Sequence, residues 1–516
     1  MIPELLAVGA MALGGCALMR AAGLRGWGVV PLGFLAGACL FVTIGLLQVA
    51  LFLPTTPAVT IALTAAGPVA WWLVRWRRGH DVLVSLPIAG LVAVVLAATV
   101  WLLRVSDLMK FHTDSIHYLM SGWLLAEGTY RADASAELFT KRGLGVPYLH
   151  AAANLDGSEL YLRSVTPLLA VATLAAIVWF FAEAARGQIS RGRLAAFAGL
   201  GLFALVTINR YVFNAFYLNG HLFAAAQLLL IVGAGWLLAR PADGLGQTGP
   251  ASGWDRRRAL ELLQLVALPA LVVTRAEGFV LAAVALLPTL LSPAVSLSHR
   301  RRAIAIFGAA CVAWNGFLTV VALIRDWGVS GEYAGGLAAG LLALAAAFVP
   351  LWSRLDQWPV RMLWVAEGAL WLVVLAFAVR RPTVLIDSAR ATYVNLFHDQ
   401  GLWGYSMVAL SAVVAIALVL YPFRDQVQLR FPLTTFVPLA IVLAYVREGA
   451  YRVGPGDSLA RMLIQYVPLA MLITIVAFAT SRRAVAEPDP QTGSIVPEQR
   501  GPNADQRIST PAAPGL

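Results

Sequence analysis

The sequence predicts an all-α polytopic membrane protein with about 15 transmembrane helices. Of its 516 residues, 59% are hydrophobic and only 13% are charged, whereas a soluble protein carries about 25% charged residues. Apolar runs of about 20 residues, the length that a helix needs to cross ~30 Å of hydrocarbon, recur along the chain. The polar gaps between these runs are mostly short, which leaves little room for a separate soluble domain.

The positions of the basic residues predict how the helices are oriented. Lys and Arg in short loops stay on the cytoplasmic side of a membrane. Here they cluster at 75–78, 186–193, 256–258, 300–302 and 482–483. Alternating the helices between these clusters places the N-terminus outside and the C-terminus in the cytoplasm, as expected for a multi-pass protein of the cell (inner or plasma) membrane. The net charge of +11 comes from basic residues spread over many loops, so no nucleic acid partner is expected.

Composition separates a long helical part, residues 1–480, from a polar tail. Residues 1–81 hold three N-terminal transmembrane helices, and residues 82–480 hold the remaining helices. Residues 481–516 are rich in Pro, Gln, Asp and Ser with few large apolar residues, a composition typical of disorder. We therefore expect a disordered cytoplasmic tail after the last helix.

The longest polar segment, 106–158, faces outward in this orientation. Shorter outward connections are expected at 209–220, 325–334, 380–402 and 447–461. After Asp114, apolar residues recur at helical spacing at Ile116, Leu119, Met120, Trp123 and Leu124, and Gly128 offers a C-terminal stop. This pattern predicts an amphipathic helix that lies in the membrane interface.

Several motifs, taken in order, resemble those of a known family. They are Asp114-Ser115 followed by Tyr118-Leu119, the run from Gly157 to Arg163 that enters a helix, Thr274-Arg275-Ala276-Glu277-Gly278 between two short helices, and Asp457-Ser458-Leu459-Ala460-Arg461 near the last helix. Together they resemble the GT-C superfamily of integral-membrane glycosyltransferases, and within it the polyprenyl-phosphate-sugar-dependent branch that includes the aminoarabinose and protein-mannosyl transferases. The resemblance covers roughly residues 82–480.

The resemblance implies a GT-C-like helical bundle with its catalytic core in residues 82–480. It also implies the partners: a polyprenyl-phosphate-linked sugar as donor, the lipid bilayer around it, and an envelope glycan, lipid or protein as acceptor on the extracytoplasmic face. Transfer from a lipid phosphate needs a carboxylate to take the acceptor's proton and cations to hold the departing phosphate. We expect Asp114 to be the base. The expected substrate-binding residues are Lys110, His117, Tyr118, Arg163, Arg275, Glu277 and Arg461.

Several of these residues also have a simpler interpretation. Asp114 or its neighbours can cap the interfacial helix, a role compatible with catalysis. Glu159 and Arg163 are spaced to pair with each other, and Arg275 and Glu277 can close a tight helical hairpin. Arg461 can anchor the last helix by extending to the lipid headgroups.

The sequence predicts no metal site and no organic cofactor, although a divalent cation stays possible. His112, Asp114 and His117 are close in sequence but lack the usual spacing of zinc ligands. Two other classes of protein remain open: a flippase or other carrier of lipid-linked saccharides, and a structural protein. Acidic residues gather in the outward segment, as expected of an enzyme. Glu367, the one acid well inside a predicted helix, keeps the carrier alternative open.

Overall fold

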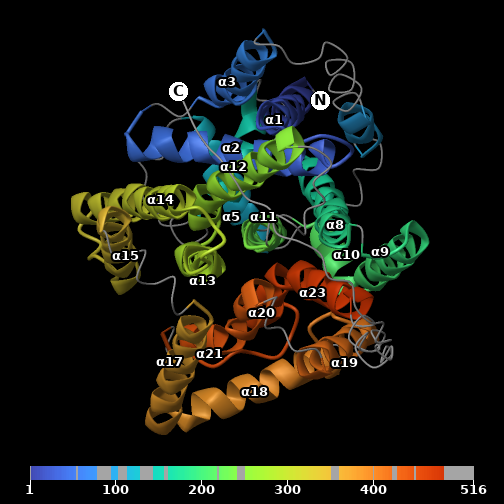
Figure 1. Ribbon diagram of the computed structural model, residues 1–516. Coiled ribbons are helices and arrows are strands. Elements are labelled where there is room, and N and C mark those ends of the chain that lie inside the picture. The colour runs from blue at the N-terminus through green and yellow to red at the C-terminus, as the bar shows by residue number, and fades with distance from the viewer. Residues whose placement is uncertain are drawn as a thin grey trace, which may run out of the picture. The chain divides into compact units, whose positions relative to one another are not determined.

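The computed structural model describes residues 2–53, 56–77, 94–102, 113–127, 143–155, 161–186, 188–217, 220–240, 250–349, 359–398, 400–420, 427–446 and 449–480. Within these ranges the chain is helical, with no β-strand (Figure 1). Residues Met1–Thr480 form one compact unit. The all-α class expected from composition is therefore confirmed.

Nine helices of the described chain are long and apolar enough to cross a membrane, and the number rises to 11 if each of two bent pairs is one span. The nine are α1 (Ile2–Ala21), α2 (Val29–Ala50), α3 (Pro57–Arg77), α8 (Val165–Ala184), α11 (His221–Leu238), α14 (Leu297–Ile324), α15 (Gly331–Phe348), α17 (Pro359–Arg380), and α20 (Val427–Thr434) with α21 (Phe436–Val446). The bent pairs are α9 (Arg191–Val206) with α10 (Asn209–Ala215), and α22 (Ser458–Met462) with α23 (Val467–Thr480).

Besides a helical stretch at 94–102, the described chain contains shorter or more polar helices. They are α5 (Thr113–Ala126), α7 (Gly145–Ala151), α12 (Pro250–Thr274), α13 (Gly278–Leu290), α18 (Pro382–Phe397) and α19 (Tyr405–Leu420), with short 3-10 turns η4 (Ala152–Leu155) and η7 (Leu463–Gln465). Helix α11 is surrounded by other helices, since all its residues are buried. It contacts α8, α12, α13, α20 and α23 and forms the centre of the unit.

The three N-terminal helices pack together through glycines. A Cβ atom at Gly14 would overlap the carbonyl oxygen of Thr64 in α3, and one at Gly15 would overlap that of Gly33 in α2. Small residues at such contacts let helix backbones approach closely, which favours association inside a membrane. Helix α2 also contacts α8 and α12, so the three N-terminal helices are joined directly to the rest of the unit.

The amphipathic helix expected after Asp114 is present as α5, from Thr113 to Ala126. Tyr118 and Leu125 are buried, whereas Ile116, Met120 and Trp123 are exposed. The helix contacts α7, and Gly122 allows this approach because a Cβ there would lie 2.8 Å from the carbonyl oxygen of Pro147.

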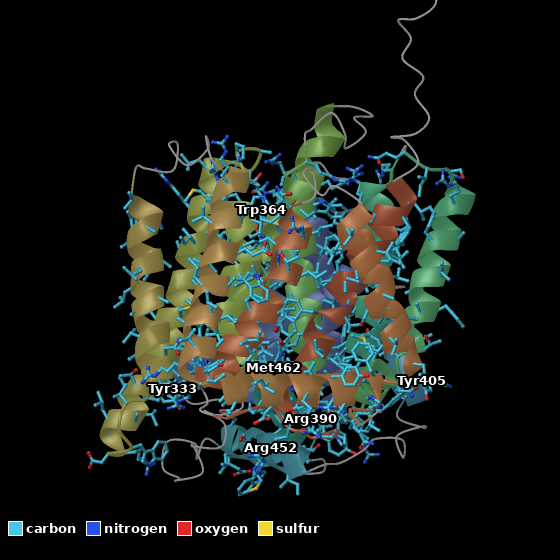
Figure 2. All side chains as sticks on the ribbon, turned by 90° about the horizontal axis from the view of Figure 1, so that it is seen from below. Tyr333, Trp364, Arg390, Tyr405, Arg452 and Met462 are labelled. Atoms are coloured by element: carbon cyan, nitrogen blue, oxygen red, sulfur yellow. The ribbon has the colours of Figure 1, made fainter. Side chains whose placement is uncertain are left out.

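Helix α18 occupies a segment where an outward connection was expected. Its buried residues, Ser388, Ala391 and Asn395, share one face. This face binds the backbone of the segment after α21, because the Asn395 side chain donates to the carbonyl of Arg452 at 2.8 Å and accepts from the N–H of Gly454 at 2.7 Å. Helix α18 runs between α17 and α19 (Figure 1). Figure 2 shows Arg390 of α18 and Arg452 at the same end of the helices, with Trp364 toward the opposite end.

Candidate functional site

The loop between α12 and α13 carries an ion pair, and helix α5 contacts this pair through Tyr118. The Nε of Arg275 donates to Glu277 Oε1 at 3.1 Å, and its Nη1 donates to the Tyr118 hydroxyl at 3.1 Å. The side chains of Arg275 and Glu277 are only 12% and 1% exposed. The structure thus brings together three of the expected substrate-binding residues, although 157 positions separate Tyr118 from Arg275.

Close packing of the backbone fixes the start of this loop. The N–H of Leu144 donates to the carbonyl of Val273 at 2.7 Å, and a Cβ at Gly145 would lie 2.5 Å from Thr274 Oγ1. The Thr274 hydroxyl also accepts from Gln227 Nε2 at 2.9 Å. The last turn of α12 is therefore tied to α7 and α11, which sets the direction in which Arg275 leaves the helix.

Residues at the bend before α23 also belong to the site. The Gln465 side chain hydrogen-bonds His221 Nδ1 at 3.2 Å, and His221 begins α11. Next to it, Tyr466 is buried with its ring against Phe436, and its hydroxyl lies within electrostatic range of Glu277. A Cβ at Gly220 would lie 3.0 Å from the Cδ of Arg275, so the start of α11 also packs on the ion pair. Together these residues form a buried polar cluster.

Charge compensation keeps Arg275 ionised. Burial alone would lower the pKa of its guanidinium, but the neighbouring Glu277 carboxylate and the Tyr118 hydroxyl outweigh burial and raise that pKa above its ordinary value. A buried guanidinium with planar donors is suited to holding a phosphate or carboxylate. Any anion that binds here has to compete with Glu277 or Tyr118 for those donors.

A second cationic group lies at the start of α22. Asp457 caps this helix by accepting from the N–H of Ala460 at 2.9 Å, and Arg461 follows one turn later. The guanidinium of Arg210 is within electrostatic range of both. Arg210 is 2% exposed and donates to the carbonyls of Gly401 (3.2 Å) and Pro455 (2.8 Å). Arg461 lies one helical turn before Gln465, so this group adjoins the cluster around Arg275.

The other expected residues lie elsewhere or outside the described chain. Arg163 precedes α8, where its guanidinium lies 6.0 Å from the ring of Tyr161. The next residue, Ser164, donates through its N–H and its hydroxyl to the buried Glu4 carboxylate of α1 at 2.5 and 2.6 Å. His117 lies on α5 and is partly exposed.

Asp114 belongs to the first turn of α5, but its side chain lies outside the described part of the structure. Lys110 lies entirely outside it. In the described ranges, no three His, Cys, Asp or Glu residues come together as a metal site would require.

Sequence reasoning missed Arg210, His221, Gln465 and Tyr466. The available signal was positional, because each is a polar side chain next to a break in an apolar run. Polar residues inside membrane segments are expensive to bury and are often functional.

No protein-family model, curated protein or solved structure matches this chain. The fold itself defines the class, which is that of an α-helical, multi-pass membrane protein.

Proposed function

We propose that this protein is an integral-membrane glycosyltransferase of the GT-C type. It transfers a sugar from a polyprenyl-phosphate donor to an envelope glycan, lipid or protein on the extracytoplasmic face of the cell membrane. In this proposal the bundle has about 15 transmembrane helices, residues 82–480 form the catalytic core, and the end that carries α5 and α18 faces outward. No metal ion or organic cofactor is part of the proposal.

The observation that carries the proposal is the hydrogen bond between Tyr118 and Arg275. Through it, the helix that begins with the proposed base is joined to a buried cation. A transferase of this kind needs its base near the acceptor and its cation near the donor phosphate, with both close to one reacting carbon. Such a site requires that the element with the base contact the element with the cation. Helix α5 and the loop before α13 make this contact.

The proposed reaction has one bond-making and one bond-breaking event. The acceptor hydroxyl oxygen forms a bond to the anomeric carbon of the sugar, and Asp114 takes the hydroxyl proton. The bond between the anomeric carbon and the phosphate oxygen breaks, and polyprenyl phosphate leaves with the bonding electrons. Arg275 holds the negative charge of the departing phosphate, with Arg461 as a second cation next to it. Glu277 keeps Arg275 oriented through their ion pair.

The test is sugar transfer by the purified protein from a panel of polyprenyl-phosphate sugars. We expect one donor to be used, Asp114→Asn to abolish turnover, and Arg275→Gln to lower kcat/KM by about 100-fold, as expected when one transition-state donor is lost. The matched controls are Asp387→Asn and Arg390→Gln on the exposed side of α18, which should keep full activity. Melting temperatures of all four variants show whether they fold.

Three results would contradict the proposal. Full activity of a folded Asp114→Asn variant would show that Asp114 is only a helix cap. Equal losses in Arg275→Gln and Arg390→Gln would show that Arg275 has no special role. Movement of an intact lipid-linked saccharide across the membrane of vesicles that contain the protein, with no sugar transfer from any donor, would identify a carrier instead.

A further inference from the structure

A shallow surface crevice that is open to its surroundings lies between α17 and α20, away from the proposed site. It is lined by Leu363, Trp364, Glu367, Val427, Arg430 and Phe431. Leu363, Val427 and Phe431 belong to a small apolar core that is separate from the main one. Figure 2 shows Trp364 toward the end of the helices opposite to Arg390 and Arg452. The crevice is therefore remote from the residues assigned to sugar transfer.

The crevice holds one positive and one negative charge. The guanidinium of Arg430 lies over the Trp364 ring, 4.0 Å from its centroid. Glu367 lies one helical turn after Trp364, and its carboxylate makes no ion pair or hydrogen bond with another described residue. A carboxylate inside a membrane helix is expensive unless it is paired or solvated. A cation and an anion that share a crevice without pairing leave both charges available to a ligand.

The surface next to the crevice is apolar and exposed. Val365 is 71% exposed and Leu372 68% exposed, and both belong to α17, one of the helices suited to cross the membrane. In a membrane protein such a face contacts lipid chains. A charged crevice beside it lies where a lipid headgroup can enter while its chains stay on the helix surface. The Arg–Trp stack also matches the aromatic and basic side chains that favour the membrane interface.

We propose that this crevice binds a zwitterionic phospholipid with a primary amine, such as phosphatidylethanolamine. Arg430, held in place by Trp364, donates to the phosphate, and Glu367 accepts from the ammonium group. The chains follow the exposed face of α17. An anionic lipid without an amine satisfies only Arg430, and a choline lipid has no N–H to donate to Glu367. The charges of the crevice therefore predict a preference for the amine, and this site is independent of sugar transfer.

The test uses the full-length protein in detergent and measures retained lipid by native mass spectrometry after adding phosphatidylethanolamine, phosphatidylglycerol or phosphatidylcholine. We expect the parent protein to prefer phosphatidylethanolamine over phosphatidylglycerol by about tenfold. Glu367→Gln should remove this preference. Arg430→Gln should weaken both lipids by about tenfold, and Arg430→Lys should restore most of the binding.

Two controls separate this site from general effects. Arg258→Gln removes an exposed basic residue from α12 and should leave lipid retention unchanged. Glycerophosphoethanolamine, which carries the same headgroup without chains, should not displace the lipid. The proposal is overturned if the parent binds the three lipids equally, if a folded Glu367→Gln variant keeps the preference, or if Arg258→Gln loses as much binding as Arg430→Gln. Displacement by the chain-free headgroup would identify a soluble ligand and overturn the assignment to a lipid.

Discussion

Protonation of His150 is expected to destabilise the folded protein. This residue of α7 is buried, and its Nδ1 accepts a hydrogen bond from the N–H of Leu162 at 3.0 Å. Nδ1 cannot accept this bond once it carries a proton. Burial lowers the pKa of His150 from 6.5 to about 4, so the ring is neutral in the folded state at pH 7.

The sign and size of the effect follow from this pKa. Between pH 6.5 and 4 the unfolded chain binds a proton at His150 that the folded chain does not bind. The contribution of His150 to stability is therefore complete above pH 6.5 and is lost as the pH falls toward 4. A change from pH 7 to pH 5 should cost about 2 kcal/mol, and the full shift corresponds to about 3 kcal/mol.

A thiol-reactive dye can report the unfolding, because Cys16, Cys39 and Cys311 are all buried and free. Melting of the parent and of His150→Gln is followed at pH 7 and pH 5, and the difference in melting temperature between the two pH values is compared. The variant keeps an acceptor oxygen but cannot titrate. Its melting temperature should therefore fall less between pH 7 and pH 5 than that of the parent, by the equivalent of about 2 kcal/mol. His398→Gln, at an exposed histidine, should behave like the parent. If His150→Gln loses as much stability at pH 5 as the parent, His150 does not titrate in this range and the reasoning is wrong.

Three further substitutions test packing and hydrogen bonding. Gly15→Leu should separate α1 from α2 and lower the free energy of unfolding by at least about 2 kcal/mol, measured by thermal melting. Gly67→Ala, where a Cβ meets open space, should cost nothing. Equal effects of the two substitutions would contradict the packing argument. Tyr148→Phe removes hydroxyl contacts of 2.8 and 2.6 Å to side chains of α2 and α3 and should cost about 1–2 kcal/mol by the same assay; an unchanged melting temperature would show that these bonds add nothing. Tyr118→Phe removes the acceptor for Arg275. It should lower the rate of sugar transfer about tenfold and cost only about 1 kcal/mol of stability. Full activity would show that α5 is not part of the site.

Apolar runs predicted the helical class because a helix that crosses a membrane needs about 20 apolar residues, whether its surface faces protein or lipid. They did not predict α18, where the residues on the buried face are Ser388, Ala391 and Asn395. That face is stabilised by hydrogen bonds to backbone groups more than 50 positions away, such as the bond from Asn395 to the carbonyl of Arg452. A pattern confined to the helix itself cannot reveal such partners.

The candidate site could also be predicted only where the interacting residues are close in sequence. Arg275 and Glu277 were recognisable because two opposite charges interrupt an apolar run, and their ion pair is local in sequence. The contact between His221 and Gln465 joins positions 244 residues apart. Each of those side chains is a single polar residue beside a helix break, and nothing in its own neighbourhood identifies the partner. Helix α7 packs on α5 at Gly122, and nothing in the residue spacing of α5 identifies α7 as this neighbour.

The contact between Glu4 and Ser164 has a consequence for biogenesis. The Glu4 carboxylate is fully buried, and the hydrogen-bond donors of Ser164 are synthesised 160 residues later. At 5–20 residues per second, the first helix waits roughly 10–30 s for these partners. During this interval the Glu4 carboxylate of α1 lacks its hydrogen bonds from Ser164. Helix α1 therefore completes its contacts only after the start of α8 has been synthesised.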